Sequence, residues 1–401
     1  MLNSQRADVV VVGGGIIGLA VAWRLRQRGA SVELLERDVL GGATSRVAAG
    51  MLAPVAEVEF GDAGLRVLEL GLGSAALWPA FAEELEAESG VDVELMRTGT
   101  LLVARDADEA SELERQLAFR RSLGLDVRRL RASEARECEP ALAPTLRMAL
   151  EAPADHSLDP RPVLQALAGA CEATGVRLRE HAAVAGIECD AACEQVLGVR
   201  LQDGELVGCR RLVIAAGPWS GALHGLPEHA GVPVRPVKGQ ILRLRDPAGP
   251  GLLSRTVRFE GGYLLPRGDG RYVLGATVEE RGFELRPTVG GVEELLRDAR
   301  ELVPGVSELQ IEELAVGLRP GTPDNAPLIG PGAVEGLVWA TGHHRNGILL
   351  APLTAALVAD MLGETAPSPA DARLLDACDP TRFARVGASA EPTPSPAGAP
   401  T

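Results

Sequence analysis

Apolar residues near the N-terminus come in short, largely continuous runs rather than in alternation with polar residues. Residues 9–12 and 32–35 form two such runs, which are typical of strands buried on both faces of a parallel sheet. A glycine-rich turn and an amphipathic helix lie between them, so residues 7–37 predict a strand, a turn, a helix and a second strand. Residues 210–217 and 336–342 repeat the buried-strand pattern later in the chain.

Longer stretches rich in Leu, Ala, Glu and Arg predict helices. The stretch 158–175 has the clearest signals, because Asp159 and Pro160 mark its start and a glycine marks its end. The other predicted helices span 62–90, 106–122, 290–302 and 347–362.

The middle of the chain predicts antiparallel strands. Such strands are expected at 236–245, 261–267 and 271–279. Residues 94–105 predict a hairpin with its turn at Thr98 and Gly99, and residues 176–188 predict a single strand.

The expected fold class is α/β, with two discontinuous domains. A Rossmann-like domain of parallel sheet and helices is predicted to alternate along the chain with an antiparallel-sheet α+β domain. The first domain is expected to comprise residues 1–60, 155–220 and 315–370, and the second residues 61–154 and 221–314. Residues 388–401 are of low complexity and predict a disordered tail.

Charge and cysteine usage exclude several classes of protein. The formal net charge of −15 argues against binding to nucleic acid or to an anionic membrane. The six cysteines lack metal-ligand spacing, so neither a zinc site nor a disulfide framework is expected. The polar N-terminus shows no signal-peptide core, and no apolar run approaches the ~20 residues of a membrane span. We therefore expect a soluble cytoplasmic protein.

The basic residues are distributed unusually, because 39 of the 40 are arginine and only Lys238, within PVKGQ, is lysine. Codon bias accounts for this ratio. The alternative is that Lys238 has a task that a guanidinium group cannot perform.

Gly13, Gly15 and Gly18 open the first predicted helix with the spacing GxGxxG. The first glycine permits a tight turn, the second lets backbone approach a pyrophosphate, and the third lets the helix pack closely on the strand. Glu36 ends the next strand, where a carboxylate can accept hydrogen bonds from ribose hydroxyls. This context predicts a dinucleotide site, with a glycine-rich turn of an ordinary βαβ unit as the alternative. It does not distinguish NAD from FAD.

Three further stretches resemble the FAD-dependent amino acid oxidases, and most closely the glycine oxidases of thiamine biosynthesis. They read GATSRVAAGMLAP (42–54), RRLVIAAG (210–217) and GLRPGTPDNAPLIG…ATGHHRNGILLAP (317–352). The resemblance covers nearly the whole chain apart from the tail. It implies that the Rossmann-like domain binds FAD, that the second domain binds substrate, and that the product supplies thiamine thiazole synthesis.

The resemblance also implies which residues contact FAD. In this family the last helix points its N-terminus at the pyrimidine edge of the flavin, where the helix dipole and free N–H groups stabilise negative charge. A metal site at His343 and His344 is not expected, because adjacent side chains point apart and no further ligand is spaced to join them. The expected FAD contacts are Gly13, Gly15, Ile16, Ile17, Gly18, Glu36, Arg37, Thr44, Ser45, Ala49, Gly50, Met51, Val184, Gly217, His343, His344, Arg345, Asn346, Gly347, Ile348 and Leu349.

For the substrate, the resemblance places Arg319 and Tyr263 at an amino acid carboxylate and Arg345 beside the pocket. A guanidinium group binds a carboxylate through two parallel hydrogen bonds. Substrate with a neutral amine would lose hydride to FAD, the imine would hydrolyse, and molecular oxygen would be reduced to hydrogen peroxide. The cofactor carries this chemistry, so no catalytic side chain is expected.

Three positions depart from the family pattern and leave the substrate open. His344 replaces an aromatic residue, Gly261 a histidine and Val278 a methionine, so a larger amine or D-amino acid is an alternative to glycine. The related sarcosine oxidases tether their flavin to a cysteine just before the TPD segment. This chain has none there, its nearest cysteines being Cys209 and Cys378, so FAD is expected to be noncovalent. Rival functions are a dehydrogenase with a non-oxygen acceptor and a flavin-binding subunit without turnover. Relatives are often tetrameric, which suggests a homo-oligomer by analogy.

Overall fold

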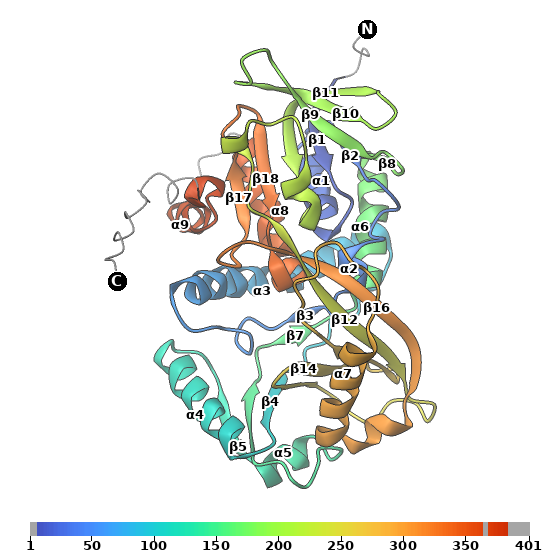
Figure 1. Cartoon of the computed structure of the whole chain (residues 1–401), viewed down its shortest axis with the longest axis vertical. Coiled ribbons are helices and arrows are strands. Elements are labelled where there is room, and N and C mark those ends of the chain that lie inside the picture. Colours follow the sequence, from blue (N-terminus) through green and yellow to red (C-terminus); the bar gives the residue numbers. More distant parts are fainter. Residues whose placement is uncertain (1–5, 364–367, 384–401) are drawn as a thin grey trace, which may run out of the picture.

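The computed structural model describes residues 6–363 and 368–383, so the predicted tail at 388–401 lies outside the described residues. Two eight-stranded sheets lie at opposite ends of the molecule (Figure 1). The mixture of a mainly parallel and a mainly antiparallel sheet confirms the predicted fold class.

The first sheet contains the predicted buried strands in the order β17–β18–β11–β1–β2–β8, and the hairpin of β9 and β10 is attached to β11. The central neighbours from β18 to β8 are parallel, whereas β17, β9 and β10 pair in antiparallel fashion. The bounds are β1 (Ala7–Val12), β2 (Val32–Leu35), β8 (Arg177–Arg179), β9 (Val184–Cys189), β10 (Val196–Leu201), β11 (Leu206–Ile214), β17 (Leu328–Pro331) and β18 (Leu337–Thr341).

A layer of helices covers this sheet and encloses the main core. Helix α1 packs against α6 and α8, and α3 also packs against α6 and α8, with the side chains of Trp23 and Trp78 fully buried between them. Residues 344–362 are long and apolar enough to cross a membrane, but 67% of this stretch is buried inside the fold, as in a core helix. The bounds are α1 (Ile16–Gln27), α3 (Asp62–Ser89), α6 (Pro160–Thr174) and α8 (Gly347–Leu362).

The second sheet has the order β16–β12–β15–β14–β13–β4–β6–β5 and is antiparallel except between β13 and β4. Helices α4 (Ala107–Ser122), α5 (Ala132–Cys138) and α7 (Val289–Leu302) belong to this end of the molecule (Figure 1). The strands are β4 (Thr100–Ala104), β5 (Arg128–Arg131), β6 (Met148–Ala152), β12 (Arg235–Arg245), β13 (Thr256–Phe259), β14 (Gly262–Pro266), β15 (Arg271–Gly275) and β16 (Gln310–Gly321).

The remaining elements are short. The strands β3 (Met51–Leu52) and β7 (His156–Ser157) form a two-stranded sheet. The others are α2 (Thr44–Val47), α9 (Pro369–Ala377), η1 (Gly217–Ala222), η2 (Glu228–Ala230), η3 (Pro304–Glu308), η4 (His344–Asn346) and η5 (Pro380–Phe383). We retain the two discontinuous domains as a proposal, with β16 running across the expected boundary between residues 314 and 315.

Two local predictions were wrong. Residues 94–105 do not form a hairpin, because Met96 bridges Ser157 while β4 pairs with β6 and β13. Gly99 has a φ of 76°, but residues 97–99 form no turn before β4 begins at Thr100. Residues 176–188 do not form one strand: β8 ends at Arg179, and His181 has a φ of 55° before β9 begins beside β10.

Candidate active site

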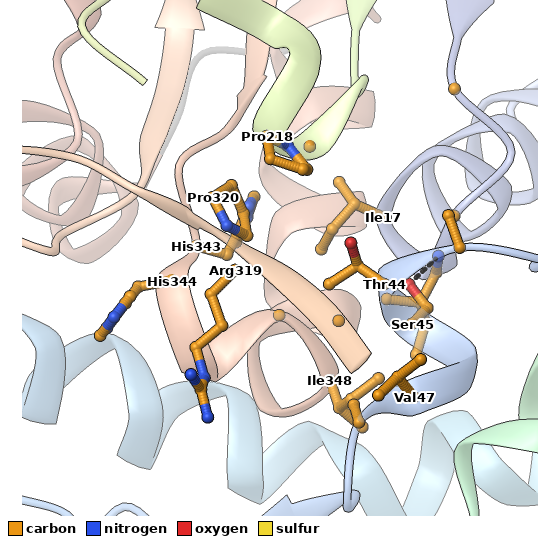
Figure 2. Close-up of a pocket in the computed structure, with 18 of the residues that line it drawn as sticks. Ile17, Thr44, Ser45, Val47, Pro218, Arg319, Pro320, His343, His344 and Ile348 are labelled. Atoms are coloured by element: carbon orange, nitrogen blue, oxygen red, sulfur yellow. Dashed lines mark hydrogen bonds between the residues drawn. The ribbon is translucent and has the colours of Figure 1, made fainter. Parts of the chain in front are cut away.

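A cavity of about 560 Å³ opens at the carboxyl ends of the parallel strands β1, β2, β11 and β18 and is also lined by residues of the second sheet. Ligands of open α/β sheets bind at this edge. In Figure 2, Ile17, Thr44 and Ser45 lie on one side of the pocket and Arg319 and His343 on the other. The predicted residues that line it are Gly13, Gly15, Ile16, Ile17, Glu36, Arg37, Thr44, Ser45, Ala49, Gly50, Met51, Val184, Gly217, Tyr263, Arg319, His343, His344, Arg345, Gly347 and Ile348.

The glycine turn has the close contacts that its spacing predicts. Gly13 has a φ of 110°, and a Cβ there would lie 2.5 Å from the carbonyl oxygen of Ala215. Gly18 does not line the cavity; a Cβ at this position would lie 1.8 Å from the carbonyl oxygen of Gly13, so it serves helix–strand packing. The N–H of Ile16 donates to Oγ of Ser45 at 3.1 Å. The start of α1 therefore faces the cavity, as an anion site requires.

Glu36 also lines this end of the cavity. Its Oε2 accepts the N–H of Gly14 at 2.7 Å, and its Oε1 accepts the N–H of Asp38 at 2.9 Å. An ionised carboxylate has about four lone-pair sites, so acceptor capacity remains for ribose hydroxyls. The guanidinium of Arg37 lies 4.3 Å from the ring centre of Trp219, which also lines the cavity.

The small-residue loop at 42–54 lies beside the cavity, and the packing of the protein itself explains why residue 50 is a glycine. A Cβ on Gly50 would lie 2.1 Å from the carbonyl oxygen of Leu158, so glycine is required by the protein backbone itself. The hydroxyl of Thr44 donates to the carbonyl of Leu318 at 2.8 Å, which ties the loop to β16. The loop therefore links the two sheets beside the cavity.

The start of α8 forms the wall near Arg319. His343 is buried, with its Nε2 3.0 Å from Oγ1 of Thr354. Burial lowers the pKa of His343 to about 3 and, assisted by the nearby guanidinium of Arg345, lowers the pKa of His344 to about 3. Both imidazoles are therefore neutral near pH 7.

Two predicted contacts in this region do not line the main cavity. Asn346 faces a smaller cavity behind Arg345, and Leu349 also lines that smaller cavity. The carbonyl of Leu349 accepts hydrogen bonds from Ser74 and Trp78, which anchors α8 to α3. The helix start thus presents Arg345, Gly347 and Ile348 rather than the full run of residues 345–349 to the cavity.

Arg319 and Tyr263 meet at the end of the cavity away from the glycine turn. Nη1 of Arg319 donates to the carbonyl of Thr277 at 3.0 Å, and no carboxylate of the described residues forms an ion pair with this guanidinium. Burial lowers the pKa of Arg319 and raises that of Tyr263, although each side chain favours the charged form of the other. Near pH 7 the guanidinium of Arg319 is a cation and the phenol of Tyr263 is neutral, so both can donate hydrogen bonds to a carboxylate ligand.

Arg345 differs from Arg319 because it already has carboxylate partners. Its Nη2 lies 2.7 Å from Oε1 of Glu59, and its Nε lies 3.4 Å from Oε2 of Glu57. The sequence reasoning missed Glu57 and its second partner, Arg258, both of which line the cavity. Burial would raise the pKa of Glu57, but the guanidinium groups of Arg258 and Arg345 lower it overall.

One missed residue had a sequence signal. Arg258 pairs across the β13–β14 ladder with Tyr263, so both side chains point to one face of the sheet. Strand alternation around the two-residue turn at 260–261 could have revealed this pairing. Glu57 had no local signal, because its partners come from distant parts of the chain.

A buried clamp holds the backbone just before Glu57. The carboxylate of Asp155 accepts the N–H groups of Val55 and Ala56 at 3.1 and 2.9 Å. Arg120 donates to the carbonyls of the same two residues at 2.9 and 2.8 Å. Both charged side chains are almost fully buried, and burial raises the pKa of Asp155 to about 7. The clamp fixes the turn that presents Glu57 to the cavity.

The fold and the glycine turn at the cavity together define a dinucleotide-binding protein. The model of a family described as FAD dependent oxidoreductase matches residues 8–361, and the chain belongs to this family. The cofactor is therefore FAD. The glycine-lined turn, the acceptor at Glu36 and the start of α8 fit such a group.

Known relatives share most of the chain. Glycine oxidase from Geobacillus kaustophilus is 37% identical, over 90% of this chain and 93% of that protein. The bifunctional protein ThiO/ThiG of Trichormus variabilis is 35% identical, and the match covers 90% of this chain and 53% of that protein. The crystal structure of the Geobacillus glycine oxidase superposes with a TM-score of 0.84 at 35% identity, covering 91% of this chain and 96% of that one.

Proposed function

We propose that this protein oxidises a small amino acid or amine, such as glycine, sarcosine or a small D-amino acid, to its imine. Water hydrolyses the imine to the 2-oxo acid (to an aldehyde or ketone when the substrate has no carboxylate) with release of the nitrogen as ammonia or an amine, and the two electrons reduce molecular oxygen to hydrogen peroxide. The single observation that carries this proposal is the guanidinium of Arg319, which has no carboxylate partner among the described side chains and faces the cavity beside Tyr263. The glycine oxidase relatives support the same reaction class.

The side chains bind and orient the substrate in this proposal. Arg319 holds the carboxylate through its planar fork, and the Tyr263 hydroxyl donates a further hydrogen bond. Bound FAD supplies the acceptor for the hydride of the substrate's α-carbon. The start of α8 places the positive end of a helix dipole at this wall, which stabilises negative charge there. Glu57 and Glu59 together balance the charges of Arg258 and Arg345, so the guanidinium of Arg319 is left for an anion.

Three small or neutral residues shape the rest of the substrate end. Gly261 and Val278 line the cavity with little bulk, and His344 is neutral near pH 7. They leave more room than the histidine, methionine and aromatic residue of the family pattern. We therefore propose that amines larger than glycine are also accepted.

The proposal is tested by measuring peroxide release from purified enzyme with glycine, sarcosine, D-alanine and D-proline. We expect peroxide in stoichiometric amount with the 2-oxo acid and with oxygen consumed. Turnover that requires an artificial electron acceptor and yields no peroxide would instead indicate the dehydrogenase. Lack of turnover with either acceptor on the whole panel would contradict the proposal.

We also propose that FAD is held without a covalent bond, because no cysteine lies just before the TPD segment and the nearest ones are Cys209 and Cys378. Acid precipitation should release all of the yellow colour to the supernatant, whereas colour in the pellet would contradict noncovalent binding. A cytoplasmic location is supported by the free state of all six cysteines. Supply of product to thiamine thiazole synthesis and a tetrameric state remain proposals by analogy.

A further inference from the structure

The chain's one lysine is fully buried in β12 and does not line the cavity. Lys238 has no exposed surface, and its Nζ donates to the carbonyl of Arg286 at 2.7 Å. Nζ also lies 3.4 Å from Oε2 of Glu279. Both partners belong to residues 277–288, the segment between β15 and α7, which we call the strap. The lysine therefore joins the strap to the strand beneath it.

Gln240 lies two residues further along β12, on the same face as Lys238, and it also holds the strap. Side chains two positions apart in a strand point the same way. Nε2 of Gln240 donates to Oε1 of Glu279 at 2.7 Å and to Oγ1 of Thr288 at 2.9 Å, and its Oε1 accepts the N–H of Thr288 at 2.9 Å. Lys238 and Gln240 thus hold the strap from Glu279 to Thr288.

The opposite face of β12 bears on the proposed substrate site. Gly239 lines the cavity, and a Cβ there would lie 2.5 Å from Nη1 of Arg319. The same Nη1 donates to the carbonyl of Thr277, the first residue of the strap, at 3.0 Å. The Thr277 hydroxyl donates to Oε1 of Glu279 at 2.6 Å and also accepts the N–H of Gln240 at 2.9 Å. One connected network therefore runs from Lys238 through Glu279 and Thr277 to Arg319.

Lysine suits this position better than the arginine that the chain uses elsewhere. An ammonium group is a compact charge on a flexible stem, whereas a guanidinium group is a wide, planar fork. The enclosed position has a carbonyl and a carboxylate arranged around one nitrogen atom. A larger head group would displace the strap, and an apolar one would leave the charge of Glu279 without its cation.

We propose that Lys238 is a positioning residue for the substrate-binding arginine: it ties the strap to β12, and the strap's Thr277 carbonyl then sets the orientation of Arg319. This inference rests on the proposed function, in which Arg319 binds the substrate carboxylate. It goes further by assigning to Lys238, which does not line the cavity, a role in substrate specificity.

The test compares Lys238→Met with Arg245→Met, which removes a cation from the end of the same strand, where it pairs with Glu312. Lys238→Met should raise KM for an amino acid about tenfold or more, with kcat changed less, because a bound carboxylate loses an aligned partner. KM for an amine without a carboxylate should stay within about twofold. Arg245→Met should leave both values near those of wild type.

Proteolysis measures how firmly the strap is held, and it needs no substrate. Trypsin can cleave after Arg281, which lies exposed within the strap, and cleavage there should be faster in Lys238→Met than in wild type or Arg245→Met. Glu279→Gln provides a milder variant that keeps the side-chain shape, and it should change KM and cleavage in the same direction. Lys238→Arg should not restore wild-type KM.

The possible results separate this inference from the proposed function. Faster cleavage with unchanged KM for amino acids, when Arg319→Ala does raise it, would overturn the positioning role. Unchanged cleavage in both Lys238→Met and Glu279→Gln would overturn it as well. If Arg319→Ala itself had no carboxylate-dependent effect, the proposed function would fail, while the cleavage rates would still report whether Lys238 holds the strap.

Discussion

The guanidinium of Arg319 lies directly against the Cα of Gly239, so close that a Cβ on residue 239 would come within 2.8 Å of Nη1, Nη2 and Cζ. The absence of a side chain at this position is therefore what makes room for the proposed carboxylate anchor. The side chain of Tyr263 packs against a glycine in the same way, because a Cβ on Gly275 would lie 2.5 Å from its hydroxyl oxygen. Both proposed substrate contacts rest on glycines of neighbouring strands, β12 and β15.

Gly239→Ala should displace this guanidinium without unfolding the strand, since Gly239 does not have a positive φ. Overpacking costs about 1–3 kcal/mol, so kcat/KM for amino acids should fall about 5- to 150-fold. The matched control is Gly290→Ala, where a Cβ would meet nothing within 4 Å. An equal loss in both variants, or no loss in Gly239→Ala, would contradict this arrangement.

Glu36→Ala should weaken FAD binding with little effect on turnover once FAD is saturating. The carboxylate is expected to bind the ribose, and loss of hydrogen bonds to a charged group costs about 1.5–3 kcal/mol, or about 10- to 150-fold in Kd. Titration of apoprotein followed by flavin fluorescence measures this change. Glu36→Gln should lie between wild type and alanine, because an amide oxygen can still accept the N–H of Gly14. A collapse of turnover at saturating FAD would show that Glu36 acts elsewhere.

The buried carboxyl of Asp155 should give the protein a measurable pH dependence of stability. Its folded pKa of about 7 lies above the ordinary value of 3.8, so the native state binds more protons than the unfolded state between these limits. The contribution of this group to the free energy of unfolding therefore falls as pH rises through that interval, by at most about 1.4 kcal/mol per pH unit. Above about pH 7 the fall should cease.

Asp155→Asn removes this titration, so the measurement is the difference in unfolding free energy between wild type and variant from urea curves at several pH values. Wild type should lose stability relative to the variant between pH 5 and 7. A difference that stays constant across this range would show that Asp155 titrates normally. The buried histidines act in the opposite direction, since their lowered pKa values make stability rise with pH, but they are identical in both proteins.

Local spacing in the sequence was enough to predict the nucleotide end of the site. Glycine is required at positions 13 and 18, because a side chain there would clash with Ala215 and with the carbonyl of Gly13, respectively. Glu36 follows a buried parallel strand, which the sequence pattern predicts. Burial of β1 and α1 likewise followed from the apolar pattern. These features depend on residues close together in the chain.

The substrate end depended on long-range pairings that spacing does not encode. Arg319 and Tyr263 came from a family resemblance, and Glu57 was missed because its partners are distant in the chain. Arg258 was missed although its pairing with Tyr263 is local. The PVKGQ stretch stood out for its single lysine, but the sequence did not show that Arg319, from β16, lies over Gly239. The wrong hairpin at 94–105 has the same cause, because the choice between β-strand partners is a tertiary one.

Arg319→Ala tests the central claim most directly, with an amino acid and a carboxylate-free amine as paired substrates. Truncating one partner of a charge-assisted pair costs about 2–5 kcal/mol, so kcat/KM for the amino acid should fall about 30- to 5000-fold. Turnover of the carboxylate-free amine and the flavin spectrum should hardly change, and Arg319→Lys should recover only part of the loss. Amino acid oxidation within a few-fold of wild type, or an equal loss with both substrates, would contradict the account.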